Sequence, residues 1–72
     1  MNKINRIEKL RKKFDLSQSQ LGKKVGVSQN TISAWETELY MPPTPKLIIL
    51  STIFGVTIEE ILGLTPDSTI IA

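Results

Sequence analysis

The sequence predicts an all-α fold, a compact bundle of five short helices, and three observations support this prediction. Apolar residues recur at intervals of three and four through most of the chain, which is the spacing of one helix face. Capping residues and glycines stand at the ends of these stretches. No strand pattern is convincing before residue 64. With 72 residues the chain allows one domain, which we place at residues 1–63, followed at 64–72 by a tail or the start of a linker or dimerisation segment.

A capping box opens the most informative stretch, residues 17–36. Ser17 is a good N-cap, and Gln20 stands three residues later, so that each side chain can bond the other's backbone N–H. The helix that follows should run over about 18–25. Gly26 then lies where a helix ends on a left-handed residue, which predicts a tight turn.

A second helix of this stretch is capped by Ser28 and should run over about 29–37. Gly22 is small at the position where the first of the two helices must pass close to the second. Both helices turn one apolar stripe inward, and its members are Leu21, Val25, Val27, Ile32 and Trp35. The spacing therefore predicts two short helices packed across a turn.

The first helix of the chain should begin at Asn2 or Asn5, either of which can cap it. Its core-facing positions recur at helical spacing and are Ile4, Ile7, Leu10 and Phe14. Its other faces are basic. Such residues can approach a phosphate backbone, or they can simply keep the helix soluble.

Two adjacent prolines at 42–43 predict a loop before the fourth helix, because proline cannot sit within a helix. Thr44 should cap the fourth helix with Pro45 in its first position. Gly55 should end it. A short fifth helix is then expected over about 57–62, where a further capping box begins.

Basic and acidic side chains are divided unevenly along the chain, although the net charge of the whole is only +2. Up to Trp35 there are eight basic and two acidic side chains, a net charge of +6. From Glu36 onward there are one basic and five acidic side chains, a net charge of −4. The cationic half indicates a face for nucleic acid, and the alternative is an ordinary solvated surface.

The composition argues against an enzyme. Histidine and cysteine, which supply the commonest catalytic bases, nucleophiles and metal ligands, are both absent from the sequence. The adjacent Glu59 and Glu60 do not share a helix face, and no glycine-rich phosphate loop is present. We therefore expect no catalytic residue, no metal and no cofactor. No apolar run reaches the roughly 18 residues that span a membrane, and the composition suits a reducing, cytoplasmic compartment.

Residues 17–36 resemble the helix-turn-helix of the phage-repressor/Cro (XRE-like) family of DNA-binding transcriptional regulators. The matching features are Gln18 at the head of the first helix, Gly22, Gly26, the apolar stripe, and the run T-I-S-A-W-E from Thr31 to Glu36. The likeness extends over about residues 4–62, which is most of the chain. It implies a lambda-repressor-like DNA-binding domain with the motif at its second and third helices.

In such a motif the N-terminal part of the second helix enters the major groove, where its side chains meet base edges. The side chains there include Ser28, Gln29, Asn30 and Ser33, and the resemblance assigns the last three to base contact. Glutamine and asparagine can each bind N6 and N7 of adenine through two hydrogen bonds, and serine can serve a base or a phosphate. The alternative is that these are ordinary surface residues.

Phosphate contacts set register and affinity rather than the choice of sequence. Family likeness puts one at Gln18, where the free N–H groups at the head of a helix also favour an anion. The further candidates are Lys23, Lys24, Thr31, Thr37 and Tyr40. Trp35 takes an apolar position and is expected in the core, whereas Glu36 is expected to fix helix and loop locally.

The loop after the motif departs from the family's pattern. Relatives often carry a basic loop there that grips the DNA backbone, whereas residues 37–40 read T-E-L-Y without a cation. Glu38 would oppose a phosphate, although Tyr40 can still donate to one. We expect either weaker DNA binding or a larger share carried by the basic first helix.

The function expected from these features is sequence-specific DNA binding by a transcriptional regulator, a repressor that excludes polymerase from its operator. A homodimer on a palindromic site is expected, with half-site centres about 34–36 Å apart. Candidate dimer contacts are the end of the fifth helix and the apolar side chains Leu39, Tyr40, Met41, Ile70 and Ile71. The alternative is a protein-interaction module, such as an antitoxin or adaptor with the same fold. A salt titration separates the two, because DNA affinity falls with a log–log slope of about −0.9 per phosphate neutralised.

Overall fold

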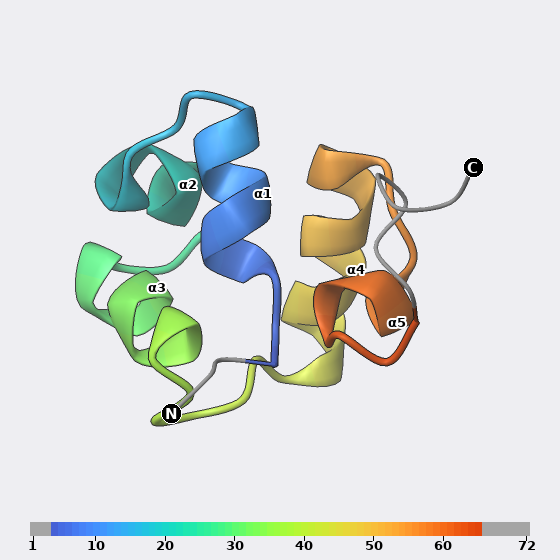
Figure 1. Ribbon diagram of the computed structural model, residues 1–72. Coiled ribbons are helices and arrows are strands. Elements are labelled where there is room, and N and C mark those ends of the chain that lie inside the picture. Colours follow the sequence, from blue (N-terminus) through green and yellow to red (C-terminus); the bar gives the residue numbers. More distant parts are fainter. Residues whose placement is uncertain (1–3, 66–72) are drawn as a thin grey trace.

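The computed structural model describes residues 4–65 and contains five helices, with no strand among these residues (Figure 1). The helices are α1 (Ile7–Lys13), α2 (Gln18–Val25), α3 (Gln29–Glu36), α4 (Thr44–Phe54) and α5 (Ile58–Ile61). The predicted all-α fold of five short helices is confirmed. Within the described part of the chain, no helix has the length and apolar character that crossing a membrane requires. Ile70 and Ile71, proposed as dimer contacts, lie outside the described residues.

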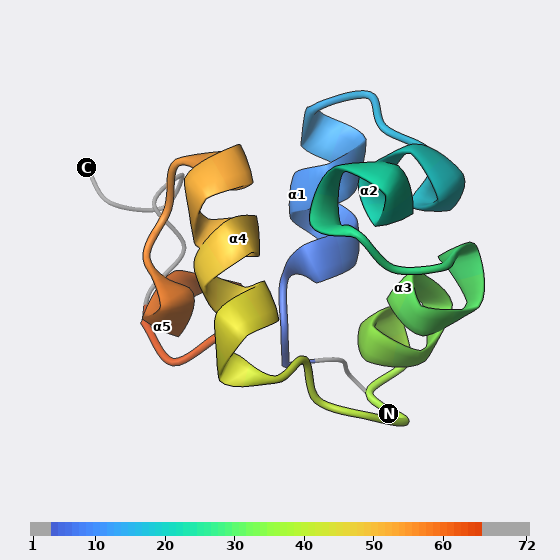
Figure 2. The ribbon, with the colours of Figure 1, turned by 180° about the vertical axis from the view of Figure 1, so that it is seen from behind.

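Helix α1 lies between two pairs of helices (Figures 1 and 2). On one side are α2 and α3, and on the other are α4 and α5. All five contribute to one core, whose buried members are Ile7, Leu10, Leu21, Val25, Ile32, Trp35, Leu47, Leu50, Phe54 and Ile61. Trp35 is 3% exposed, as its apolar position predicts. Because helices this short are marginal alone, packing on the shared core supplies most of their stability.

The predicted helix ends around the central turn are confirmed. Ser17 Oγ accepts a hydrogen bond from Gln20 N at 3.0 Å, and Gln20 Oε1 accepts one from Ser17 N at 2.8 Å, so both bonds of the capping box are present. Gly26 is left-handed, with φ at 86°. Ser28 Oγ accepts from Thr31 N at the head of α3. Local signals therefore fix where α2 ends and where α3 begins.

The predicted start of α1 is wrong. Arg6 is the N-cap of α1 and makes no side-chain capping bond. Asn5 lies one residue earlier, where its Oδ1 accepts from Ile7 N at 3.2 Å, and Asn2 lies outside the described residues. The helix begins later than predicted, and Arg6 N, which has no partner within the helix, donates to Ile61 O of α5 at 2.8 Å.

Helix α4 begins one residue earlier than predicted. Its N-cap is Pro43 and its first residue is Thr44, so Pro45 occupies the second position. Proline is tolerated at both places because the first N–H groups of a helix have no partner within it. The predicted end at Gly55 is confirmed, with φ at 67°.

Two side chains that were predicted to face the core are exposed. Ile4 is 64% exposed, since α1 begins only after it, and Phe14 is 45% exposed. Phe14 follows the last residue of α1, and its ring packs against that of Phe54 with the centroids 5.4 Å apart. This ring pair joins α1 to α4 at the edge of the core.

Candidate nucleic-acid interface

Close packing of α2 against the start of α3 fixes the geometry of the motif. Gly22 is buried in α2, and a Cβ added to it would lie 2.6 Å from Val27 O and 3.3 Å from Ser28 O. Those two atoms belong to the backbone between the helices, so no larger residue fits without moving the turn. Gly22 therefore has the role predicted for it.

Helix α3 turns one face to the core and the opposite face to solvent. Ile32, Trp35 and Glu36 are buried. The exposed and half-buried side chains of the opposite face, here called the outer face of α3, are Gln29, Asn30, Ser33, Ala34 and Thr37. Residues four apart lie above one another on a helix, so this face has one row through positions 29, 33 and 37 and another through 30 and 34. Three of the four predicted base-contacting residues belong to it.

Gln18 connects the outer face of α3 to a buried carboxylate. Gln18 Nε2 donates to Glu36 Oε1 at 3.0 Å, and Gln18 Oε1 accepts from Gln29 Nε2 at 3.3 Å. Because a carboxylate only accepts, Glu36 turns the NH₂ group of Gln18 toward itself and leaves the carbonyl oxygen facing Gln29. Gln29 then presents its own NH₂ group to Gln18. One N–H and Oε1 of Gln29 remain for a ligand.

A buried ion pair holds that carboxylate in place. Arg11 Nε donates to Glu36 Oε2 at 2.6 Å, and Arg11 Nη2 donates to Glu36 Oε1 at 3.3 Å. Their side chains are only 11% and 3% exposed. Arg11 Nη1 also donates to Leu16 O at 2.8 Å. The hydrogen bond to Glu36 is the largest cause of a raised pKa at Arg11. The negative charges of Glu36 and Glu8 also raise this pKa, whereas burial of the guanidinium group lowers it.

Sequence reasoning missed Arg11, although a signal for it was present. It lies four residues after Ile7, on the stripe of the first helix that faces the core. A charged side chain at such a position requires a buried partner. The local role predicted for Glu36 is too narrow, because its carboxylate joins α1, α2 and α3.

Three predicted DNA-contacting residues use their hydroxyl groups within the protein. Ser28 Oγ accepts from Thr31 N at 3.2 Å and lies 3.0 Å from Thr31 Oγ1. Thr37 Oγ1 donates to Ser33 O at 3.0 Å and to Ala34 O at 3.3 Å. Each of these hydroxyl groups therefore already has a partner within the protein, although the bonds themselves lie at the surface.

Lysines supply the exposed positive charge of the cationic half. Lys23 and Lys24 are exposed in the last turn of α2, and the exposed lysines of α1 are Lys9, Lys12 and Lys13. The two arginines are turned inward. Arg11 binds Glu36, and Arg6 donates to backbone carbonyl groups in and after α5. The sequence charge of the cationic half therefore exceeds the charge that it presents to solvent.

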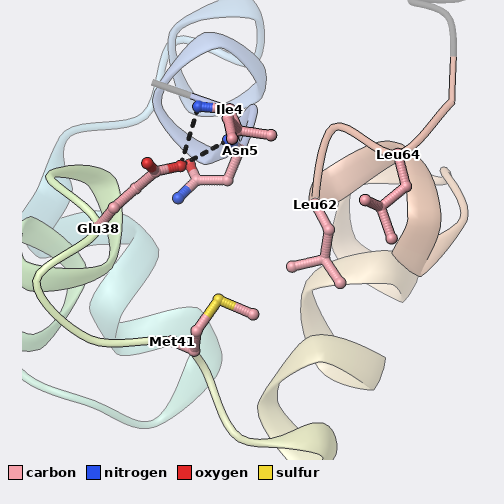
Figure 3. A pocket seen from close by; sticks show the side chains of 6 residues that line it. All are labelled: Ile4, Asn5, Glu38, Met41, Leu62 and Leu64. Atoms are coloured by element: carbon pink, nitrogen blue, oxygen red, sulfur yellow. Dashed lines mark hydrogen bonds between the residues drawn. The ribbon is translucent and has the colours of Figure 1, made fainter. Parts of the chain in front are cut away.

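The carboxylate of Glu38 is hydrogen-bonded to the N-terminal segment. Its Oε2 accepts from Ile4 N at 2.9 Å and from Asn5 N at 2.8 Å (Figure 3). Asn5 Nδ2 donates in turn to Trp35 O at 2.9 Å, in the last turn of α3. The loop after α3 is thus tied to the start of the chain, while Tyr40 in the same loop is 66% exposed.

An apolar groove of about 290 Å³ lies beside Glu38 (Figure 3). Its lining residues are Ile4, Asn5, Glu38, Met41, Leu62 and Leu64. The adjoining loop exposes further apolar surface, since Leu39, Tyr40 and Met41 are between 66% and 69% exposed. Two of the predicted dimer contacts, the loop and the end of α5, therefore meet at one surface. Among residues 4–65, no histidine, cysteine or carboxylate side chains gather in a group that could hold a metal ion.

Comparison with known proteins places the motif in a family. Residues 7–61 match the helix-turn-helix family model. The HTH-type transcriptional regulator YobD of Bacillus subtilis is 39% identical over 62 residues, which are 86% of this chain and 55% of YobD. The regulator YgzD of the same organism is 30% identical over 64 residues, or 89% of this chain and 97% of YgzD. The HTH-type transcriptional activator BcrR of Enterococcus faecalis is 37% identical over 58 residues, or 81% of this chain and 28% of BcrR.

The fold is similar to that of the P22 c2 repressor, solved in complex with the synthetic operator 9T. The TM-score is 0.80 at 32% identity, and the match covers 90% of this chain and 100% of the repressor chain. The resemblance seen in residues 17–36 thus extends to the arrangement of all five helices. The chain belongs to the phage-repressor/Cro (XRE-type) helix-turn-helix family of DNA-binding transcriptional regulators.

Proposed function

We propose that this chain is a sequence-specific transcriptional repressor that binds a palindromic operator as a homodimer through the major groove. The observation that carries the proposal is the bond from Gln29 to Gln18 at the exposed head of α3. It orients two amide groups on the face that a helix-turn-helix turns toward base edges. The similarity of the fold to the P22 c2 repressor, which was solved bound to an operator, supports docking of α3 in the major groove.

Gln29 is proposed to read adenine. After its bond to Gln18, it retains one N–H donor and the Oε1 acceptor, which is the pair that adenine N7 and N6 require. Asn30, exposed beside it, offers the same chemistry to a neighbouring base pair. Because Gln18 and Glu36 fix the amide orientation before DNA arrives, less side-chain entropy is lost on binding.

Gln18 is proposed to bind a phosphate with its remaining N–H. It heads α2, whose first backbone N–H groups and dipole also favour an anion. Lys23 and Lys24, exposed at the other end of α2, are proposed as further phosphate contacts, with Thr31, Thr37 and Tyr40 in secondary roles. These contacts would set register rather than sequence choice.

The proposed dimer uses the surface where the α3–α4 loop meets the groove beside α5. Exposed Leu39, Tyr40 and Met41 lie next to an apolar groove. In a dimer with a twofold axis, the loop of each copy would pack against the groove of the other. Half-site centres would then lie about 34–36 Å apart. The similarity to the P22 c2 repressor favours negative regulation of transcription. The relative BcrR, in contrast, is named as an activator.

The test is selection of bound sequences from a random duplex library by the full chain, followed by the same selection with Gln29→Ala. We expect a palindromic site with adenine at one position per half-site. Gln29→Ala should bind that site with a loss of about 1–3 kcal/mol and lose the preference at that position alone.

Gln20→Ala is the matched control, since it removes an exposed glutamine that only caps α2. It should lower helix stability and leave base preference unchanged. If Gln29→Ala selects the same site with unchanged affinity, the assignment is wrong. If folded wild-type protein enriches no sequence, the protein-interaction module becomes the better proposal, with the groove as its contact surface.

A further inference from the structure

Met41 belongs both to the α3–α4 loop and to the apolar groove beside it. Its side chain is 67% exposed, and it lines the groove together with apolar Ile4, Leu62 and Leu64. Figure 3 shows the thioether extending from the loop into the space between Asn5 and Leu62. Because loop and groove are the two parts of the proposed dimer contact, the Met41 side chain of each copy would lie where the two parts meet.

Met41 is also the side chain at this surface that an oxidant can change. The sequence contains no cysteine, and its two methionines are Met1 and Met41. Met1 lies outside the described residues, so Met41 carries the one sulfur atom of residues 4–65. The indole of Trp35 is protected, since this residue is only 3% exposed. A peroxide in solution therefore reaches the Met41 sulfur without any opening of the fold.

We propose that a peroxide regulates this protein by oxidising Met41 to its sulfoxide, which dissociates the dimer and releases the operator. A lone pair on sulfur attacks one oxygen of hydrogen peroxide, the S–O bond forms, the O–O bond breaks, and water leaves. Sulfur thereby loses two electrons, which reduce the peroxide. The inference rests on the proposed function, because it acts through the proposed homodimer.

The groove has little to offer a sulfoxide oxygen. Its charged group, the carboxylate of Glu38, only accepts hydrogen bonds. The backbone N–H groups of Ile4 and Asn5 already donate to that carboxylate, and Asn5 Nδ2 donates to Trp35 O. Oxidation turns an apolar side chain into a polar one, and a polar group that loses water without gaining hydrogen bonds is destabilised. Packing of loop against groove is therefore weakened by the sulfoxide of Met41.

The folded monomer should tolerate the same change. Met41 is exposed and lies outside the buried core, so its sulfoxide stays in water. The loop around it is held by other groups, since Leu39 N donates to Ala34 O at 2.9 Å and Pro42 is buried. Oxidation should thus act on the association of two copies and leave the helix-turn-helix of each copy intact.

The experiment treats the full chain with hydrogen peroxide at a protein concentration below that of dimerisation, and mass spectrometry follows oxygen addition at Met41. Sedimentation equilibrium then gives the dimer dissociation constant. We expect it to rise about a hundredfold, or tenfold for each of the two sulfoxides, which corresponds to about 1.4 kcal/mol each. Affinity for the selected palindrome should fall by a similar factor. Affinity for a single half-site and the melting temperature of the monomer should not change.

Met41→Leu is the matched control, because it keeps an apolar side chain of similar size and removes the sulfur. Peroxide can then oxidise Met1 alone, and neither dimerisation nor operator binding should change. Met41→Gln, which is polar without any oxidant, should dimerise about as weakly as the oxidised wild type. Treatment of the oxidised wild type with methionine sulfoxide reductases should restore the dimer.

The outcomes separate this inference from the function on which it rests. The inference is overturned if Met41 resists peroxide in the monomer, if its complete oxidation leaves dimerisation unchanged, or if Met41→Leu loses as much affinity as wild type. A lower melting temperature of the oxidised monomer overturns it too, because the sulfoxide would then act on the fold. In each case the reduced protein still dimerises on its palindrome, and the proposed function stands. If folded, reduced wild-type protein neither dimerises nor selects a palindrome, the proposed function fails, and the inference with it.

Discussion

The ion pair between Arg11 and Glu36 is the residue-scale feature on which both the core and the outer face of α3 depend. Two charges that are 11% and 3% exposed are stable only together, because either one alone would be buried without a partner. Arg11→Met should therefore lower the free energy of unfolding by about 3–5 kcal/mol. Urea unfolding followed by circular dichroism measures this loss.

Lys12→Met provides the comparison for Arg11→Met. Lys12 is on the same helix, and its partner Glu8 lies 3.2 Å away, but its side chain is 65% exposed. An exposed pair of this kind contributes little, so the loss should stay below about 1 kcal/mol. If the two variants lose the same free energy of unfolding, the buried Arg11–Glu36 pair contributes no more to stability than an exposed pair.

At this scale the sequence predicts single positions well where a local rule applies. Gln18 and Gln29 could be named from their places at two helix heads, but the bond between them depends on how α2 packs on α3. Arg11 and Glu36 are 25 residues apart, and no periodicity pairs them. The bond from Thr37 Oγ1 to Ser33 O could not be predicted either, because the rotamer of a side chain is not written in its residue type.

Gly22 controls how two elements, α2 and α3, are placed relative to each other. In an isolated helix, alanine is more favourable than glycine by about 1 kcal/mol. Here the added Cβ would lie 2.6 Å from Val27 O, so the turn must move. We expect Gly22→Ala to lower the free energy of unfolding by a net of about 1–3 kcal/mol. In thermal unfolding, each kcal/mol corresponds to a fall in melting temperature of roughly 4–8 °C for a domain of this size.

Ser19→Ala is the control for Gly22→Ala, because it introduces the same residue at an exposed position of the same helix. Its melting temperature should equal or slightly exceed that of wild type. DNA affinity should fall in Gly22→Ala even below its melting temperature, since α3 shifts relative to Gln18. An unchanged or raised melting temperature in Gly22→Ala would mean that the turn accommodates the methyl group freely.

Elements whose ends are set by neighbouring residues were predicted closely, and others were not. The boundaries of α2 and α3 follow from Ser17, Gly26 and Ser28, all of which act within a few residues. The start of α1 was predicted less well, and beside it Arg6 N bonds to Ile61 O of α5, which is 55 residues away in sequence. Tertiary contacts of this length leave no local signal.

At the scale of the whole molecule, the N-terminal segment holds the two sides of the fold together. Asn5 and Glu38 tie it to the end of α3 and the loop that follows. Arg6 ties it to α5, through a bond from its backbone N–H to Ile61 O and bonds from its guanidinium group to Glu60 O and a further carbonyl group. Segments from both ends of the described chain thus meet beside the groove of Figure 3.

Removing the guanidinium group should loosen α5 before it loosens the motif. Arg6→Met keeps the backbone bond to Ile61 and loses the two side-chain bonds, each worth about 1.5–3 kcal/mol for a charged donor before solvation of the exposed part reduces it. Helix α5 has only four residues and depends on such contacts, so its amide hydrogens should exchange at least tenfold faster, while those of α2 and α3 change less. Lys13→Met, which removes an exposed charge from α1, should leave both sets unchanged. Equal acceleration in all five helices would instead mean that the domain opens only as a single unit, with the N-terminal segment as one more part of its core.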